Sequence, residues 1–327
     1  MNASQAMAGS AADAQSHGRD SGPAADELAI RVAGLVKTYG PLRALDGLDL
    51  EVRQGVVYGF LGPNGAGKTT TMRILTGLIR ADAGRVELFG QPLRWLDRRP
   101  LFGVGALIES PAFYPYLSGR DNLRVLAGFG AAPRRGRVDE VLELVDLDER
   151  APDRYETYSL GMKQRLGIAA ALLNDPRLLL LDEPANGLDP AGIVEMRTLL
   201  KTLADAGKTV FVSSHILPEI QQMADEVAII AHGRLVRAGS LDRLLGETSE
   251  IHLHVAPDEV PRATELLAPV AADVHADGHG PGWLSVGAAP ARAAELNRVL
   301  VSAGVDVSGL EVGSDLEALF LSLTEAP

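Results

Sequence analysis

The chain has 327 residues, of which 46% are hydrophobic and 23% charged, a composition typical of a globular protein with a buried core and long enough for two domains. Its formal net charge of −12 argues against a protein that coats nucleic acid through bulk charge, so no nucleic-acid partner is expected. The absence of cysteine excludes disulfides, thiol catalysis and thiolate metal sites, and it fits a reducing compartment.

Residues 1–27 are small or polar, with almost no large apolar side chain. No apolar segment of the secretory kind follows Met1, so we expect a disordered tail. Alternating apolar residues then predict strands over residues 28–36 and 44–52. Tyr39 lies between them, where an aromatic ring can stack on an adenine, although this residue taken alone fits a core or turn role better.

A Gly-rich segment between a strand-like run (residues 56–61) and a helix-like run (residues 71–78) has the spacing of a phosphate-binding loop. Its glycines let backbone N–H groups point toward phosphate oxygens, and the helix adds its positive N-terminal end. Lys68 is placed to reach the β- and γ-phosphates, and the Thr69 hydroxyl to hold Mg²⁺. The expected nucleotide contacts are Gly62, Pro63, Asn64, Gly65, Ala66, Gly67, Lys68, Thr69 and Thr70.

Residues 84–89 and 103–108 are predicted as further strands, and a Pro- and aromatic-rich loop, Glu109–Leu117, follows them. Such aromatics suit a surface that receives another protein, and an ordinary packed loop is an equal alternative. Residues 118–145 have the apolar spacing of helices, interrupted by a basic turn at Arg134–Arg137.

Ser159 and Gly161 stand at the start of a long apolar helix, where a serine and free backbone N–H groups offer a second anion site. Four successive leucines then predict a central strand covered on both faces, ending in Asp182 and Glu183. Asp182 is placed to bind the Mg²⁺ shell, and Glu183 to orient or deprotonate an attacking water. Two carboxylates can also simply cap a helix, an alternative that the phosphate loop disfavours.

A turn over residues 185–190 carries Asp189, and an amphipathic helix is predicted over residues 192–206. Residues 209–215 are predicted as another buried strand, which ends in His215. A single histidine is usually packed in a core, but at the end of a strand in the same sheet it can contact a γ-phosphate. Residues 227–238 contain two further strands that complete the sheet.

In this order the motifs resemble the nucleotide-binding domain of an ABC transporter, over residues 28–245. They are Tyr39, Gly62–Thr70, Glu109, Ser159–Arg165, Leu178–Pro184, Asp189 and His215. The resemblance implies an α/β fold: a P-loop NTPase (RecA-like) core with an antiparallel β subdomain and a helical subdomain at about residues 110–165. It also implies an ATPase with ATP and Mg²⁺ as cofactors.

The resemblance assigns roles to residues at the matching positions. Catalytic roles fall to Lys68, Glu183 and His215. Nucleotide contacts beyond the phosphate loop fall to Tyr39, Glu109, Ser159, Gly161 and Asp189, and metal ligation to Thr69, Asp182 and Glu109. The family binds ATP between two such domains placed head to tail, so Ser159 and Gly161 of one copy would touch the γ-phosphate held by Lys68 of the other.

Two departures from the family pattern stand out. The signature, usually Leu-Ser-Gly-Gly-Gln, runs from Tyr158 to Met162 as Tyr-Ser-Leu-Gly-Met, and Glu109 replaces the usual Gln near the metal. The amino-acid sequences of residues 108–115 and 158–165 resemble those of the bacterial drug-efflux and bacitracin-resistance branch. That branch implies export of a drug, antibiotic peptide or similar amphipathic compound through a separate membrane permease, with this chain on the cytoplasmic face of the membrane.

From residue 249 onward the pattern changes, and residues 249–327 are expected to form a small α+β domain of ferredoxin-like type. The expected strands cover residues 251–255, 283–286 and 305–312, and the expected helices residues 262–267, 289–303 and 315–323. The unit resembles the C-terminal accessory domain of many drug-export ATPases. Its histidines, which lack a fixed ligand spacing, indicate a solvated strand face in preference to a metal site; they are His252, His254, His275 and His279.

Two other functions fit the sequence less well. A soluble ABC-type ATPase that acts on the ribosome or DNA usually resembles two fused nucleotide domains or carries a long coiled-coil insert, whereas this chain has one phosphate loop and no sustained heptads. A regulatory nucleotide-binding module without turnover is disfavoured by the presence of Glu183 and His215.

Overall fold

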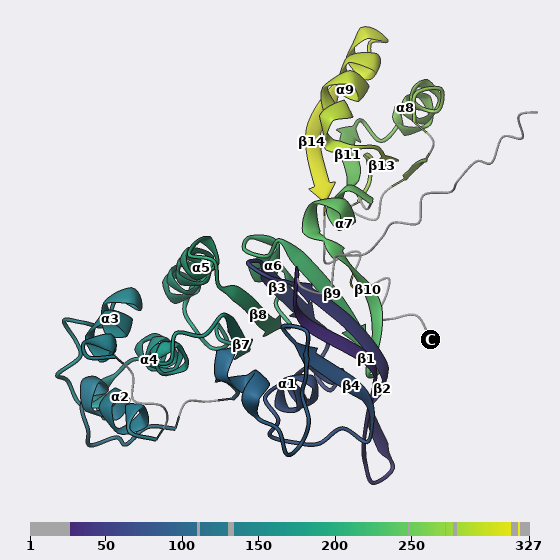
Figure 1. Cartoon of the computed structure of the whole chain (residues 1–327). Coiled ribbons are helices and arrows are strands. Elements are labelled where there is room, and N and C mark those ends of the chain that lie inside the picture. The colour runs from purple at the N-terminus through teal and green to yellow at the C-terminus, as the bar shows by residue number, and fades with distance from the viewer. Residues whose placement is uncertain are drawn as a thin grey trace, which may run out of the picture.

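The computed structural model describes residues 27–109, 112–129, 134–247, 249–271, 273–276, 280–314 and 320. Nearly all of the tail expected to be disordered lies outside these residues, as do His279 and, apart from Phe320, the last expected helix. Within the described part, the strands form three sheets: an antiparallel one near the beginning, a mainly parallel one in the middle, and a second antiparallel one near the end (Figure 1).

The first sheet has the strand order β2-β1-β4-β5, and all its pairs are antiparallel. Its strands are β1 (Leu28–Tyr39), β2 (Leu42–Arg53), β4 (Ala83–Leu88) and β5 (Gln91–Pro92). The alternating apolar residues predicted from the sequence form its buried face, as at Ile30 and Val32. This face packs on α1 (Lys68–Leu75) and on the central sheet, in one hydrophobic cluster.

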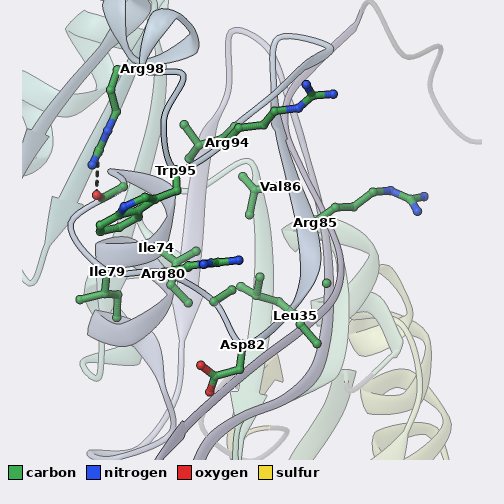
Figure 2. Close-up of a pocket in the computed structure, with 15 residues that line it drawn as sticks. Leu35, Ile74, Ile79, Arg80, Asp82, Arg85, Val86, Arg94, Trp95 and Arg98 are labelled. Atoms are coloured by element: carbon green, nitrogen blue, oxygen red, sulfur yellow. Dashed lines mark hydrogen bonds between the residues drawn. The ribbon is translucent and has the colours of Figure 1, made fainter.

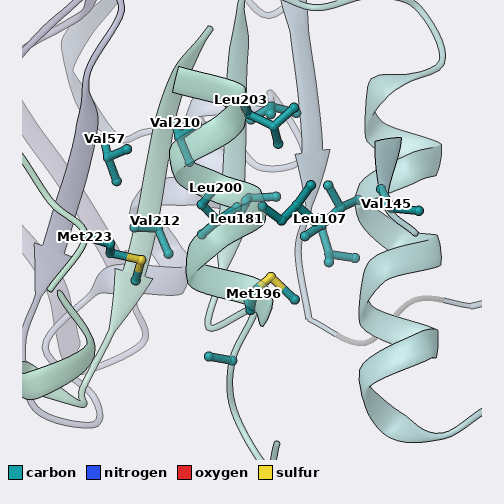
Figure 3. Packing of buried hydrophobic residues seen from close by; sticks show 14 of the residues in the cluster. Val57, Leu107, Val145, Leu181, Met196, Leu200, Leu203, Val210, Val212 and Met223 are labelled. Atoms are coloured by element: carbon teal, nitrogen blue, oxygen red, sulfur yellow. The ribbon is translucent and has the colours of Figure 1, made fainter. Parts of the chain in front are cut away.

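The central sheet has the order β10-β9-β3-β8-β7-β6, with β10 antiparallel at one edge and the other strands parallel. Its strands are β3 (Val57–Leu61), β6 (Val104–Leu107), β7 (Leu178–Asp182), β8 (Thr209–Ser214), β9 (Glu226–Ala231) and β10 (Arg234–Ser240). The leucines of β7 divide between its faces. Leu178 and Leu180 join the cluster with α1, whereas Leu179 and Leu181 join a second cluster with the other helices (Figure 3). Coverage of both faces explains the continuous apolar run.

The second cluster is built from helices that cover the opposite face of the central sheet. They are α2 (Gly119–Ala127), α3 (Arg137–Leu144), α4 (Leu160–Leu172), α5 (Pro190–Asp205), α6 (Leu217–Gln221) and α7 (Leu241–Glu247). Figure 3 shows Met196, Leu200 and Leu203 of α5 directed at the strands. The helices α2, α3 and α4 contact one another beside β6, the edge strand of the central sheet (Figure 1). Short 3₁₀ helices cover Arg99–Gly103, Tyr155–Thr157 and Pro290–Arg292.

The last sheet has the order β12-β13-β11-β14 and is antiparallel throughout. Its elements are β11 (Ser249–Val255), α8 (Val260–Leu267), β12 (Val274–Ala276), β13 (Trp283–Gly287), α9 (Ala293–Ser302) and β14 (Val307–Ser314). This β-α-β-β-α-β order is that of a ferredoxin-like unit. Ile251, Leu253 and Val255 of β11 face α8 and α9 in a separate core. Phe320, beyond this unit in sequence, packs instead against the cluster of the central sheet.

The α/β fold with its phosphate-loop core and antiparallel subdomain agrees with the fold class predicted from the sequence. The main differences concern short elements. The strand β12 and the helix α7 were not predicted, because a three-residue strand and a single seven-residue helix give too few positions to show a period.

Candidate nucleotide site and family membership

The phosphate loop connects β3 to α1, and two of its glycines are required by their surroundings. Gly67 has φ +109°, a backbone conformation that side-chain-bearing residues rarely adopt, and a Cβ there would lie 2.7 Å from the Ala44 carbonyl oxygen. A Cβ at Gly62 would lie 2.5 Å from the Ile230 carbonyl oxygen. The loop is therefore wedged against neighbouring backbone, which fixes its path at the start of α1.

Lys68, the first residue of α1, has its side chain 5% exposed. Its ammonium donates to the carbonyls of Gly62 (2.7 Å) and Pro63 (3.3 Å), so it turns back over its own loop. The same nitrogen lies 3.5 Å from Glu183 Oε1. Burial lowers the pKa of Lys68, and the negative charges of Glu183 and Asp182 oppose that effect. A cation is thus held in the loop by neighbours that phosphate oxygens can replace.

Asp182 ends β7, and the register of the sheet decides its partner. Because β7 and β8 pair in parallel with Asp182 opposite Ser213, the Ser213 hydroxyl can donate to Asp182 Oδ1, at 2.5 Å. The same hydroxyl accepts the backbone N–H of Glu183 at 3.0 Å. Asp182 is 8% exposed, so its carboxylate is fixed in orientation by one buried hydrogen bond.

Glu183 occupies the centre of the site. Its backbone has φ +48°, unusual for a residue with a side chain, and this turn takes its carboxylate out of the strand direction. Oε1 lies near Lys68, while Oε2 lies 3.1 Å from His215 Nδ1 and accepts from the Asn186 amide at 3.4 Å. The structure therefore brings together Lys68, Glu183 and His215, three groups predicted from separate motifs.

The remaining predicted residues lie in different local settings. Ser159 is the N-cap of α4, with its hydroxyl accepting from Met162 N–H at 3.2 Å, and Asp189 is the N-cap of α5, accepting from Gly192 N–H at 2.9 Å. Glu109, at φ +64°, directs its carboxylate to Arg73 of α1. Tyr39 ends β1 and is half exposed, with the Lys37 ammonium nitrogen 5.4 Å from the centroid of its ring.

The beginning of α4 lies beside the turn that precedes α5. A Cβ at Gly187 would lie 3.1 Å from Leu160 Cδ2, and one at Gly161 would lie 3.8 Å from Leu188 Cδ2. Both capped helix starts, with Ser159 and Asp189, thus belong to one surface region of the chain. Their contacts in the described residues are with their own helices, not with Lys68.

Sequence reasoning missed three polar residues of the site. Ser213 holds Asp182, Asn186 holds Glu183, and Glu219 of α6 lines a small cavity together with Glu183 and His215. Glu219 Oε1 is buried without a hydrogen-bond partner among the described residues, and burial raises the pKa of this carboxyl group. For Ser213, the available signal was its position in the last two residues of a buried strand that leads into His215. Asn186 and Glu219 carry no such signal, because their approach to Glu183 depends on how the segments after β7 and β8 fold.

Comparison with known proteins agrees with this geometry. The family model described as "ABC transporter" matches residues 45–186. The bacitracin transport ATP-binding protein BcrA of Bacillus licheniformis is 41% identical over 297 residues, which cover 90% of this chain and 96% of the relative. The chain belongs to the ATP-binding subunits of ABC transporters.

A second relative and two solved structures are also similar to this ATP-binding subunit. The daunorubicin resistance ATP-binding protein DrrA3 of Streptomyces coeruleorubidus is 41% identical over 248 residues, 75% of this chain and 78% of the relative. A dimeric post-hydrolysis ATP-binding cassette bound to ADP and Pi has TM-score 0.58 and 28% identity over 65% of this chain and 98% of that one. The cbiO1 subunit from Clostridium perfringens, with TM-score 0.63 and 24% identity over 75% of this chain and 97% of that one, shares the fold.

The subunit therefore binds and hydrolyses ATP. These relatives are transporter components, which favours a role in transport over one on the ribosome or DNA. Among the described helices, none combines the length and the apolar character needed to cross a bilayer.

Proposed function

We propose that the subunit hydrolyses ATP between two head-to-tail copies and that this cycle powers export of a drug, an antibiotic peptide or a similar amphipathic compound through a separate membrane permease. The observation that supports this most is Glu183, held between the Lys68 ammonium and the His215 ring beside Asp182. A carboxylate so placed can accept a proton from water at the edge of the phosphate loop.

The contacts of these three residues suggest how they act. Glu183 is the general base, and its unusual backbone turn aims it at the loop. When ATP binds, Lys68 exchanges the carbonyls of Gly62 and Pro63 for phosphate oxygens, which releases Glu183 from the ammonium. His215 keeps Glu183 oriented through Nδ1 and, from this position beside Glu183, would donate to the γ-phosphate.

The residues present fit Mg²⁺. This ion prefers oxygen ligands, and the site offers the Asp182 carboxylate, one oxygen of which is taken by Ser213, and the Thr69 hydroxyl in the first turn of α1. Bound there, Mg²⁺ would neutralise phosphate charge. Glu109 can join these ligands only by leaving Arg73, to which its carboxylate is paired.

The second copy would complete the site through the start of α4. Ser159 accepts the Met162 N–H, while the N–H groups of Leu160 and Gly161 precede the first intrahelical bonds of α4, at a helix end of the kind that attracts anions. The neighbouring Leu160 is 48% exposed although it is apolar, which suits a surface covered in a dimer. Asp189, on the adjoining turn, would lie at the same interface. Tyr39 would stack on the adenine from its half-exposed position.

The permease would dock on the aromatic loop after β6. Phe113 packs inward on the main core, whereas Tyr114 and Tyr116 are exposed with ring centroids 5.8 Å apart. An anchored loop that presents two tyrosines is suited to protein contact. Docking there would hold the subunit on the cytoplasmic side of the membrane. The names of the relatives, bacitracin transport and daunorubicin resistance, support the class of exported compound.

Glu183→Gln tests the catalytic proposal. The amide keeps the size of the side chain but cannot take a proton, so turnover should fall by roughly 10²–10⁴-fold, while MgATP binding persists and ATP-bound dimer accumulates. Steady-state phosphate release and size-exclusion chromatography with MgATP measure the two effects. Glu51→Gln, which alters an exposed carboxylate paired to Arg31 in the first sheet, is the control. Normal turnover in Glu183→Gln would refute the assignment of the base.

A further inference from the structure

A second cavity lies at the other end of α1 from the phosphate loop, between that helix and the first sheet. Its volume is about 340 Å³, within the range of small-ligand sites. The floor is apolar, with Leu35, Ile74 and Val86 buried in the core below it. The wall and rim carry the polar groups, which are Arg80, Asp82, Arg85, Arg94, Trp95 and Arg98.

The side chains that line the cavity are mainly positively charged. Four arginines line the cavity and one carboxylate, Asp82, in a chain whose formal net charge is −12. Asp82 is already engaged: it accepts from the Lys37 ammonium at 2.9 Å and from the Thr38 N–H at 2.7 Å. Two further carboxylates adjoin the lining along the chain. Glu87 lies 3.9 Å from Arg85 Nε, and Asp97 is held by two hydrogen bonds from the Arg99 guanidinium, at 2.9 and 2.7 Å.

Most described arginines of the subunit have a carboxylate within 4.0 Å, but within the described residues Arg80, Arg94 and Arg98 have none. Arg98 has a structural role, since it donates to the Gly77 carbonyl at 2.6 Å and so caps the C-terminal end of α1. Trp95 lies against Arg98, with the guanidinium carbon 5.0 Å from its ring centroid. Among the described residues, the Arg80 side chain has no such contact, whereas the charge of Arg94 adds to the Arg99 hydrogen bonds that lower the pKa of Asp97.

Figure 2 shows how these side chains lie. Arg80 extends across the middle of the cavity below Trp95, while Arg94, from the segment that carries Trp95, and Arg85, from β4, point toward the outside. A guanidinium above an apolar floor is suited to an anion that also carries an apolar part, because it can form two parallel hydrogen bonds to a phosphate or carboxylate. Leu96, beside Trp95, is 94% exposed and extends the apolar surface outward.

We propose that this cavity binds an organic phosphate, with its apolar part over Leu35, Ile74 and Val86 and its phosphate on Arg80. Arg94, which points outward in the structure, would turn inward to join Arg80 on the phosphate. The site is separate from the ATP site, because it is formed by the last turn of α1 and by β4 and not by the phosphate loop. Phosphate attached to an apolar group occurs in anionic phospholipids and in free phosphate esters, and the experiment distinguishes these sources.

Trp95 gives a direct signal, since the chain has only two tryptophans and the other, Trp283, is in β13. In a Trp283→Phe background, with the ATP site saturated with MgADP, n-octyl phosphate should change Trp95 emission saturably, and the uncharged n-octyl glucoside should not. Arg80→Gln and Arg94→Gln should each weaken binding by about 10-fold or more. Arg99→Gln, an adjacent arginine outside the cavity that is paired to Asp97, should leave it unchanged.

If dihexanoyl phosphatidylglycerol binds more tightly than n-octyl phosphate and dihexanoyl phosphatidylcholine does not bind, the proposal is supported and the ligand is a lipid. Binding of n-octyl phosphate without phosphatidylglycerol binding would support it with a free ester. An unchanged Trp95 signal, an equal response to n-octyl glucoside, or full binding by Arg80→Gln would overturn it. So would a response to an acidic peptide alone. MgATP affinity of each variant, measured separately, reports whether it is folded.

Discussion

The central sheet and the C-terminal sheet both bury apolar side chains, but they differ in where their charged and polar side chains lie. In the central sheet the parallel strands β3, β7 and β8 all end at one edge, where Lys68, Asp182 and Glu183 gather. In the C-terminal sheet neighbouring strands run in opposite directions, so their ends alternate between the two edges. Among its described residues, Ser285 is the buried polar side chain, and it is bonded to the His252 ring at 2.8 Å.

The difference shows what parallel pairing provides. Side chains that follow different strands converge at the carboxyl edge of a parallel sheet, which is why ligands bind there. The two apolar clusters that cover both faces of the central sheet keep this edge rigid while it holds buried charges. The histidines of the C-terminal sheet lie on a strand face instead, and in the described residues no group of three metal-binding side chains forms.

The strongest test compares the two ends of the central sheet. Lys68→Ala removes a buried ammonium from the carboxyl edge, and nucleotide affinity should fall by about 2–5 kcal/mol, or roughly 30-fold to several thousand-fold. Lys208, also largely buried, pairs with Asp175 at 2.8 Å and precedes β8 at the opposite edge. Calorimetric titration with MgATP should find Lys208→Ala unchanged in affinity; equal losses in the two variants would show that general destabilisation is the cause.

A smaller effect is expected from Ser213→Ala. This change removes the donor to Asp182 and the side-chain acceptor for the Glu183 N–H. A hydrogen bond to a charged group contributes about 1.5–3 kcal/mol, so kcat should fall by roughly 10-fold or more. The Mg²⁺ concentration for half-maximal activity should rise as well, because Asp182 loses its orientation. These two quantities come from ATPase assays over a Mg²⁺ series.

Ser214→Ala is the matched control, since Ser214 is also buried but its hydroxyl accepts from the Ile216 N–H and bonds to neither Asp182 nor Glu183. If both serine variants lose activity to the same extent, or if Ser213→Ala keeps its Mg²⁺ dependence, Ser213 does not position the carboxylate.

The fold class could be predicted from the sequence, and the principal groups of the candidate site could be proposed from it, because the phosphate loop and the strand ending in Asp182 and Glu183 are short-range patterns. The Ser213–Asp182 bond could not be predicted, because it depends on the register between β7 and β8, two strands far apart in the chain. The pairing of Glu109 with Arg73 and the cavity at Arg80 depend likewise on how the first sheet packs against α1.

The smallest effect on the ATP site should come from a core change in the C-terminal sheet. Leu253 of β11 is fully buried against the helices α8 and α9. Leu253→Ala should therefore destabilise this unit by about 2–5 kcal/mol. Leu310, its neighbour on β14, is half exposed, so Leu310→Ala should cost far less. Thermal unfolding of the full chain, followed by Trp283 emission in a Trp95→Phe background, measures both variants, and MgATP affinity should stay within about 2-fold of the parent because this sheet has its own core. A parallel loss of affinity in Leu253→Ala would mean that the two sheets are coupled, and Phe320, which packs on the central cluster from beyond the C-terminal unit, would be the first contact to remove.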